Sequence, residues 1–270
     1  MHAWYSDGAT LRALYDEGGG PRWGHVTKRR FTAKETRVSN WEGIEVGADA
    51  RVTKLRFNTN TRHSLASNIT ALSEAMVKHL GELPALARLN LTVCPLRTLP
   101  DSIGQLQSLT SLRLFKCFSL TTLPDSIGQL QALASLDLKH CTSLRTLPDP
   151  IGQLQSLPQL NLQHCTSLMT LPDSIGQLQS LASLGLCHCE SLTQLPESIG
   201  QLQALASLDV NNCLALTGHE AVVVKLKARN VTVYSVRKKS RFHFPPSPPA
   251  YIVHFDHWIK FFIFIFIFWF

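Results

Sequence analysis

The chain has no apolar run of 18 residues, and its first residues do not form a basic stretch followed by an apolar one. The first absence argues against a conventional membrane-spanning helix, which needs about 20 apolar residues. The second argues against a secretory signal peptide. Together they predict a cytoplasmic protein.

The motifs that most often mark catalysis are also missing. There is no GxxxxGK[ST] phosphate-binding loop, no HExxH zinc motif and no nucleophile elbow. The serines stand mainly in repeated SIG and TSL phrases, where they suit turns. We therefore expect a non-enzymatic protein without a cofactor.

Positive charge is scarce where a nucleic-acid binder would need it. Residues 1–85 carry 12 basic and 9 acidic side chains, residues 86–217 carry 6 and 8, and residues 218–270 carry 8 and 2. A nucleic-acid-binding domain concentrates basic charge on its ordered surface, whereas the middle of this chain is nearly neutral. We predict no nucleic-acid partner.

One repeated phrase dominates the chain. A Leu-Pro pair recurs every 24 residues, at 99–100, 123–124, 147–148, 171–172 and 195–196. The pattern LxxLxLxxC fills six units, at 86–94, 109–117, 133–141, 157–165, 181–189 and 205–213. A fixed period of this length is typical of a solenoid, in which each unit packs only on its neighbours.

Within each unit, alternating residues predict a strand, and successive strands should join in a parallel sheet. The return segment LPDSIGQL predicts one short turn of 3₁₀ type, because proline fixes its start and a glycine is expected to interrupt it. The acidic residue after each proline suits a helix N-terminus. Such short return segments predict modest curvature.

Six of the seven cysteines obey the repeat: Cys94, Cys117, Cys141, Cys165, Cys189 and Cys213. One per unit predicts a ladder of reduced thiols rather than disulfide pairs. Cysteine is small, tolerates burial and donates weakly, so we expect a structural role.

The phrase LPxSIGxLxxLxxLxLxxCxxL resembles the leucine-rich repeat of plant-type intracellular disease-resistance proteins and of SHOC-2-like proteins. Residues 86–217 match it densely and residues 41–85 loosely. The flank, with its Trp-Gly hairpin and RVxxLxxxxN strand, resembles the N-terminal cap of plant receptor-type repeat proteins without the usual cysteine pair. The resemblance implies an α/β solenoid, a leucine-rich repeat horseshoe with a parallel concave sheet and helical caps. Its expected function is protein–protein interaction, in signalling or defence.

Four segments follow. Residues 1–85 form an N-terminal cap with a degenerate first repeat, and a helix is predicted over 67–80 on the convex side. Residues 86–217 form the array, and residues 218–236 form a C-terminal cap of one helix and one strand. Residues 237–270 read as a disordered basic and Pro-rich tail whose apolar end, 261–270, is too short to span a bilayer. A weak membrane anchor and translated non-coding sequence are the alternatives for that end, and the second is preferred.

Binding in such solenoids uses the variable positions of the concave strands. The N-terminal candidates are basic with one aromatic, and the C-terminal ones are amide-rich, which suits a polypeptide with an acidic segment on a monomeric protein. The predicted partner-binding residues are Lys54, Arg56, Arg88, Asn90, Arg113, Phe115, Lys116, Asp137, Lys139, His140, Asn161, Gln163, His164, His188 and Asp209.

His140, His164 and His188 share one position in three units and should stack about 5 Å apart. A linear ladder does not converge on a tetrahedral point, so no metal site is predicted, and a pH-sensitive surface stays open. Two other functions also stay open. One is an exported receptor-type ligand-recognition domain, for which N-x-[ST] sequons start at Asn68, Asn90 and Asn230. The other is a membrane-associated adaptor that uses the apolar tail.

Overall fold

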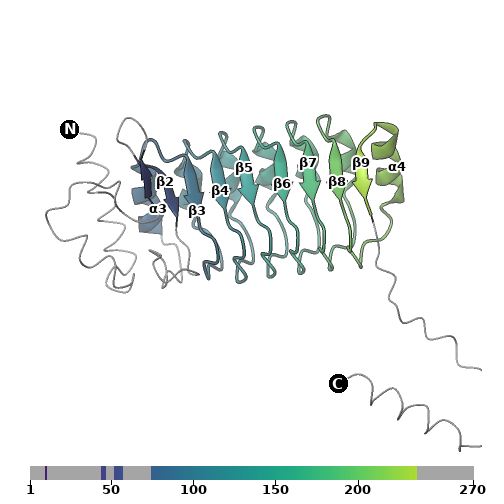
Figure 1. The fold of residues 1–270 in the computed structure, drawn as a ribbon, viewed down its shortest axis with the longest axis horizontal. Coiled ribbons are helices and arrows are strands. Elements are labelled where there is room, and N and C mark those ends of the chain that lie inside the picture. Colours follow the sequence, from purple (N-terminus) through teal and green to yellow (C-terminus); the bar gives the residue numbers. More distant parts are fainter. Residues whose placement is uncertain (1–9, 11–43, 47–51, 57–73, 236–270) are drawn as a thin grey trace, which may run out of the picture. The chain divides into compact units, whose positions relative to one another are not determined.

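The computed structural model describes residue 10 and residues 44–46, 52–56 and 74–235. Nine strands in this part of the chain form one sheet in sequence order (Figure 1). β1 (Ile44–Val46) runs antiparallel to β2 (Val52–Arg56), and every later strand is parallel to the one before it. The others are β3 (Arg88–Asn90), β4 (Ser111–Arg113), β5 (Ser135–Asp137), β6 (Gln159–Asn161), β7 (Ser183–Gly185), β8 (Ser207–Asp209) and β9 (Thr232–Tyr234). The predicted parallel solenoid is confirmed.

The strands of the array are only three residues long because the backbone turns sharply after each. Lys116, for example, follows β4 at a φ of 61°, in the left-handed region, and its N–H still donates to the carbonyl of Lys139 at 2.9 Å. Residues at the same repeat position, from Val93 to Asn212, share this positive φ. Hydrogen bonding between repeats therefore continues beyond the regular strand.

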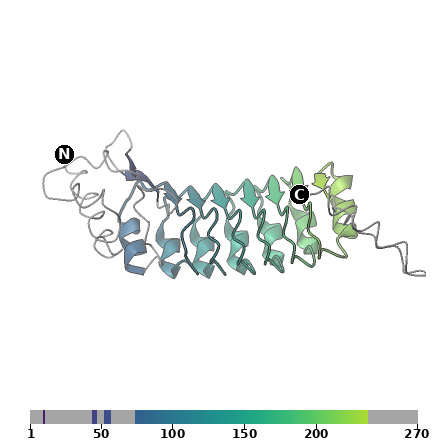
Figure 2. The ribbon, with the colours of Figure 1, turned by 60° about the horizontal axis from the view of Figure 1, so that its bottom comes forward.

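Five 3₁₀ turns lie opposite the strands in a parallel row (Figure 2). They are η3 (Asp101–Gln105), η4 (Asp125–Gln129), η5 (Asp149–Gln153), η6 (Asp173–Gln177) and η7 (Glu197–Gln201). The predicted 3₁₀ type is confirmed. Proline is the N-cap of every turn and no side chain caps its N–H groups, so the acidic residues lie in the first turn without acting as caps.

The sequence predicted that the glycine of each unit interrupts the 3₁₀ turn. This prediction is wrong, because the glycine lies inside the turn. Its role is close packing between repeats. A Cβ on Gly152 would lie 2.3 Å from the carbonyl oxygen of Ser174 and 2.9 Å from its Cβ. Gly104, Gly128 and Gly176 meet the next turn in the same way, whereas a Cβ on Gly200 in the last turn would have only Lys225 Cδ at 3.8 Å.

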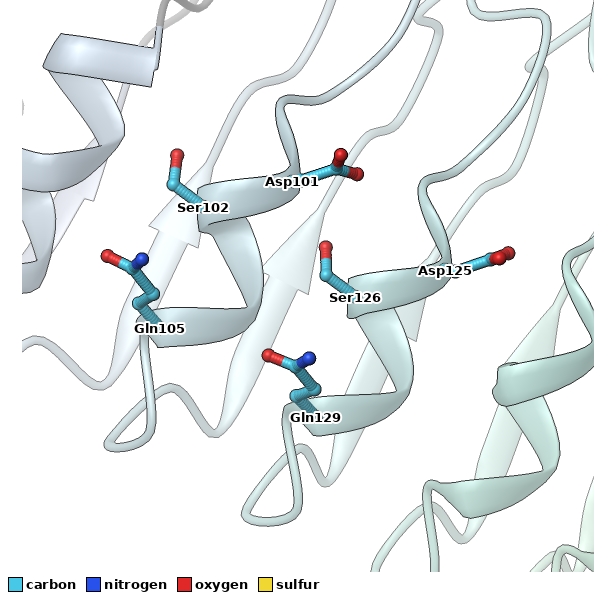
Figure 3. Close-up of a pocket in the computed structure, with 6 residues that line it drawn as sticks. All are labelled: Asp101, Ser102, Gln105, Asp125, Ser126 and Gln129. Carbon is cyan, nitrogen blue, oxygen red and sulfur yellow. The ribbon is translucent and has the colours of Figure 1, made fainter.

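Figure 3 shows the polar hollow that this stacking leaves on the outer surface of η3 and η4. Asp101, Ser102 and Gln105 line it from η3, and the equivalent Asp125, Ser126 and Gln129 line it from η4. Each of the two turns thus contributes one carboxylate, one hydroxyl and one amide at equivalent repeat positions.

Leucine, isoleucine and cysteine side chains of successive units fill the space between strands and turns as one continuous core. Each 24-residue unit brings the same set, which in the unit of β5 is Leu133, Leu136, Leu138, Cys141, Leu144, Leu147, Ile151 and Leu154, all buried. The cost of ordering each unit is offset by burial against both neighbours, which is why the two end units need covers.

The two ends of the array are covered by helices. α3 (Glu74–Gly81) packs beside η3 and α4 (Glu220–Ala228) beside η7 (Figure 2). At the C-terminal end, the guanidinium of Arg229 donates to the carbonyls of Gly200 and Leu202 at 2.8 Å and of Gln203 at 3.2 Å. Within the array, Gln155 Nε2 donates in the other direction, to Gln177 O in the next unit, at 3.0 Å. Arg229 thus attaches the C-terminal cap to the last turn of the array.

The helix predicted over 67–80 is confirmed where it is described, from Glu74, and it lies on the side of the turns as expected. The C-terminal helix and closing strand are confirmed as α4 and β9. The rest of the predicted N-terminal cap, including the end of the first repeat at 57–60, and the tail at 237–270 lie outside the described residues.

We predict that Gly152→Ala destabilises the protein by about 2 kcal/mol or more, because the new methyl group overlaps the backbone of Ser174. Gly200→Ala is the matched control in the same DSIGQ-type turn, and we expect it to be neutral or to stabilise by up to about 1 kcal/mol. Urea unfolding followed by circular dichroism measures both. Equal midpoints for the two variants would show that close packing is not what the glycine provides.

Candidate partner-binding face

The structure divides the predicted binding residues between two rows. Those on the strands are Lys54, Arg56, Arg88, Asn90, Arg113, Asp137, Asn161 and Asp209. The other seven, Phe115, Lys116, Lys139, His140, Gln163, His164 and His188, lie on the turn that follows each strand. Their assignment to the strands themselves is therefore wrong. The alternating pattern continues to Phe115, whereas strand β4 ends two residues earlier, at Arg113.

Four candidates at the strand ends are engaged in shaping that turn. Asp137 Oδ1 accepts a hydrogen bond from the N–H of Lys139 at 3.1 Å, and Asn161 Oδ1 does the same for Gln163 at 3.1 Å. Asp209 and Asn90 bond the N–H two residues on at 3.0 Å each. These are Asx turns, in which a side chain imitates the next backbone carbonyl. The four side chains have a structural role that sequence spacing alone did not indicate.

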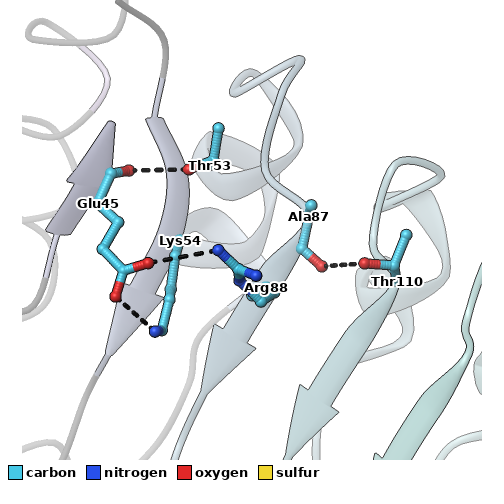
Figure 4. A network of polar contacts seen from close by, with 6 residues as sticks. All are labelled: Glu45, Thr53, Lys54, Ala87, Arg88 and Thr110. Carbon is cyan, nitrogen blue, oxygen red and sulfur yellow. Dashed lines mark hydrogen bonds and ion pairs between the residues drawn. The ribbon is translucent and has the colours of Figure 1, made fainter. Parts of the chain in front are cut away.

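The basic N-terminal end is partly neutralised by a residue that the sequence did not single out. Glu45 of β1 pairs with Lys54 Nζ of β2 and, at 3.3 Å, with Arg88 Nη2 of β3 (Figure 4). The hydrogen bond from Lys54 holds the pKa of Glu45 below its usual value, and Arg88 and Arg56 act in the same direction. The antiparallel pairing of β1 with β2 brings Glu45 next to Lys54. In the sequence, the phrase IEV shortly before the RVxxL strand is the signal that could have indicated this pairing.

Phe115 is the centre of a cationic cluster beside β4. The guanidinium carbon of Arg113 and the Nζ of Lys116 each lie 5.1 Å from its ring centroid. The ring of His140 meets it edge-on, with centroids 5.6 Å apart. Arg113 also pairs with Asp137 at 3.3 Å, the one carboxylate among these contacts. The cluster, Arg113, Phe115, Lys116 and His140, joins an aromatic surface to an excess of positive charge.

His140, His164 and His188, the histidine row, continue from this cluster along the turns. The rings stack with centroid distances of 4.4 and 4.5 Å and interplanar angles of 12° and 10°. The predicted stack is confirmed. At its far end His188 Nε2 lies 3.2 Å from Asn212 Nδ2, and its Nδ1 lies 3.8 Å from Glu190 Oε1. Burial, and then the neighbouring cationic groups, lowers the pKa of His140 and of His164.

The six repeated thiols form a ladder within the core. Cys117 Sγ donates to Leu91 O at 3.1 Å, and each later thiol, to Cys213, bonds the equivalent carbonyl one repeat back at 3.1 to 3.2 Å. All seven cysteines are unpaired with one another. Burial raises the pKa of Cys117 to about 12 and that of Cys213 to about 11. Such thiols are poor nucleophiles, and their contacts agree with the expected structural role.

Among the described residues, no group of three or more His, Cys, Asp or Glu side chains is placed to hold a metal ion. In the same part of the chain, every helix is too short or too polar to cross a bilayer. The strand side and its turns carry aromatic rings, among them Phe115 and Tyr234, together with several cations, amides and imidazoles.

Comparisons with known proteins agree with this architecture. Residues 64–170 match the family model described as a leucine-rich repeat region. A plant ice-binding protein of known structure is 22% identical, with a TM-score of 0.54, over 76% of this chain and 62% of that one. The leucine-rich repeat domain of the type III effector XopL is 26% identical (TM-score 0.42), over 59% of this chain and 62% of that one.

The Arabidopsis receptor kinase HAESA, solved in complex with the peptide hormone IDA, is 20% identical (TM-score 0.41), over 78% of this chain and 48% of that one. This chain spans less than two thirds of the length of each of the three structures. No curated protein matches it. At these identities the likeness concerns the fold.

We predict that one thiol per molecule reacts quickly with iodoacetamide under native conditions and that all seven react after denaturation. Cys187 is the fast one because it is half-buried on the turn, whereas the six ladder thiols are buried. Mass spectrometry of timed samples measures the count, and Cys187→Ser should abolish the fast reaction. Fast labelling of two or more thiols in the native protein would contradict the thiol ladder.

Proposed function

Because this chain is a leucine-rich repeat protein, we propose that it binds a polypeptide partner through its strand face and the adjoining turns, with Phe115 as the anchor. Leucine-rich repeat regions are generally non-enzymatic interaction modules, and the fold is typical of protein–protein interaction and of receptor ectodomains. The proposal names the part of this surface that makes the contact and the chemistry that it selects.

The observation that carries the proposal is the flanking of Phe115 by Arg113 and Lys116, each 5.1 Å from its ring. Aromatic residues and arginine are the residue types that most often dominate binding energy at protein interfaces. The two cations also hold the ring in place, so less side-chain entropy is lost on binding. A half-buried, preorganised ring is what an interface anchor requires.

The charge around this anchor selects an acidic partner. Arg113 and Lys116 flank the ring, and Lys139 lies close enough to His140 of the same cluster to add to burial in lowering the pKa of that imidazole. Among the described residues, Asp137 is the carboxylate that pairs with Arg113. Towards the N-terminal end, Glu45 already offsets Lys54 and Arg88. The excess positive charge is therefore centred on β4 and β5, farther into the array than the sequence indicated.

The proposal includes a cytoplasmic, monomeric protein that takes part in signalling or defence, on the resemblance of its repeats to intracellular disease-resistance proteins. The thiol ladder supports this location, since its donors are reduced cysteines. The exported receptor-type domain is the second candidate. At one of its sequons, Asn90 lies within β3 and its Oδ1 accepts hydrogen bonds from the N–H and the hydroxyl of Thr92, at 3.0 and 2.6 Å.

The proposal is tested by replacing the anchor, Phe115, and measuring the loss of affinity for the partner. Proteins captured with the wild type from the cell of origin are identified, and the affinity of the purified partner is then measured by calorimetry. We expect Phe115→Ala to weaken binding by about tenfold or more, which corresponds to about 1.4 kcal/mol. Lys139→Glu should weaken binding of an acidic partner as well.

Phe118→Ala is the matched control, because Phe118 lies in the same unit, is 49% exposed and has no ring contact with the cluster. We expect it to bind as the wild type does. Circular dichroism and thermal unfolding must show that all variants remain folded. An affinity for Phe115→Ala within about twofold of the wild type overturns the anchor.

A further inference from the structure

The histidine row differs from the rest of the face in that its charge depends on pH within the physiological range. Its three residues stand at one repeat position with φ of 61° to 62°, on the turns after β5, β6 and β7, and their rings are stacked. The side chain of His188 is 32% exposed, and His140 and His164 are likewise half-buried. The three rings are therefore partly accessible to a partner, and stacking on the neighbouring ring fixes their orientation.

Both faces of the His164 ring are covered by the rings of His140 and His188, at 4.4 and 4.5 Å. A partner can therefore reach it only at the edge of the ring. Parallel rings have parallel lone pairs, so adjacent nitrogens do not point at a common centre, and this geometry does not favour a metal. Protonated imidazole edges instead present a line of N–H donors.

The charged groups that face the row are unevenly placed. His140 is near Lys116 and Lys139, and Asp137 opposes them. His188 has Glu190 at 3.8 Å, with Asn212 on its other side. His164 lies between two other imidazoles, with Lys139 close enough to act against its charge and Glu190 only weakly for it. The middle of the row therefore has no internal carboxylate in contact to balance a positive charge.

We propose that the protonated histidine row, together with Lys116 and Lys139, binds the acidic segment of the polypeptide partner, laid across the repeats from β4 towards β7. This inference rests on the proposed function and gives its binding a dependence on pH. An external carboxylate supplies the missing counter-charge at His164, and the lysines hold the segment at the anchor end.

The direction of the effect follows from linkage. In the free protein, burial and the neighbouring cations lower the pKa of His140 and of His164, which favours the uncharged form of both rings. A bound carboxylate favours the charged form and raises those pKa values, so binding takes up protons. Affinity must then increase as pH falls from neutral towards the pKa values of the free row, and it levels off below them.

The probe is a fluorescein-labelled hexa-aspartate peptide, whose carboxylates have a pKa of about 3.9 and so stay ionised down to pH 5.5. Its dissociation constant is measured by fluorescence anisotropy at pH 5.5 and 7.5 and at fixed ionic strength. We expect binding to be about tenfold tighter or more at the lower pH. Calorimetry in buffers of different ionisation enthalpy should show proton uptake on binding.

The decisive variant replaces all three histidines with asparagine (His140→Asn, His164→Asn and His188→Asn). Asn212 already occupies the same repeat position with a φ of 57°, so asparagine fits this backbone. We expect the affinity ratio between the two pH values to fall below about twofold. Lys116→Gln with Lys139→Gln should weaken binding at both pH values, while binding stays tighter at the lower pH because the three histidines are retained. His79→Asn on α3, away from the row, is the control and should behave as the wild type.

An unchanged pH ratio in the triple variant, or no pH dependence in the wild type, overturns the proposal. These outcomes are independent of the anchor test. If Phe115→Ala abolishes partner binding at pH 7.5 while hexa-aspartate binding ignores pH, the proposed function stands and the protonated row does not. If the pH ratio disappears only in the triple variant while Phe115→Ala keeps the partner, the row stands and the anchor does not.

Discussion

The distance between neighbouring strands, about 4.8 Å in a parallel sheet, is the constraint on which the structure depends. Every residue of a unit has its own copy at about this distance, so only residues that tolerate an identical neighbour can recur. Gly152 recurs because no Cβ fits there against Ser174. Cys141 recurs because a thiol can donate to the carbonyl of Leu114 in the preceding unit at 3.2 Å. The imidazoles recur because flat rings stack at 4.4 and 4.5 Å.

The same short distance between units disfavours charged residues that recur at one repeat position. A repeated charge on the strands would lie beside its own copy in a row of mutual repulsion. The strand ends alternate instead, with Arg113 beside Asp137 at 3.3 Å and Arg88 reaching across β2 to Glu45. Counting charges along the sequence therefore overstates the field of this face, because the opposite charges are neighbours in space while they are 24 or more residues apart in the chain. What remains unbalanced, around Lys116 and Lys139, is smaller and more local.

The 24-residue period predicted the sheet and the core leucines, and the proline and glycine of each unit predicted the 3₁₀ turns. The two helical covers were predicted outside the array, where the end units must be buried. The roles that depend on contacts across repeats could not be predicted in this way. Asp137 and Asn161 look like free surface residues in the sequence, but the early exit of the chain from the strand turns them into Asx turns. Glu45 became part of the face only because β1 folds back on β2 and brings it within reach of Arg88.

Recognition and stacking compete for the same positions in a repeat array of this kind. A side chain that is well stacked on its copies contributes to cohesion but offers a partner little that distinguishes one unit from the next. Phe115 escapes this because its neighbours along the row are different residues, Lys139 among them, so the ring has no copy to stack on and meets His140 edge-on. The histidines meet both demands, since neutral rings stack whereas protonated rings repel and need an outside anion. Variation between units provides an anchor at one end of the face, and repetition provides a titratable surface beside it.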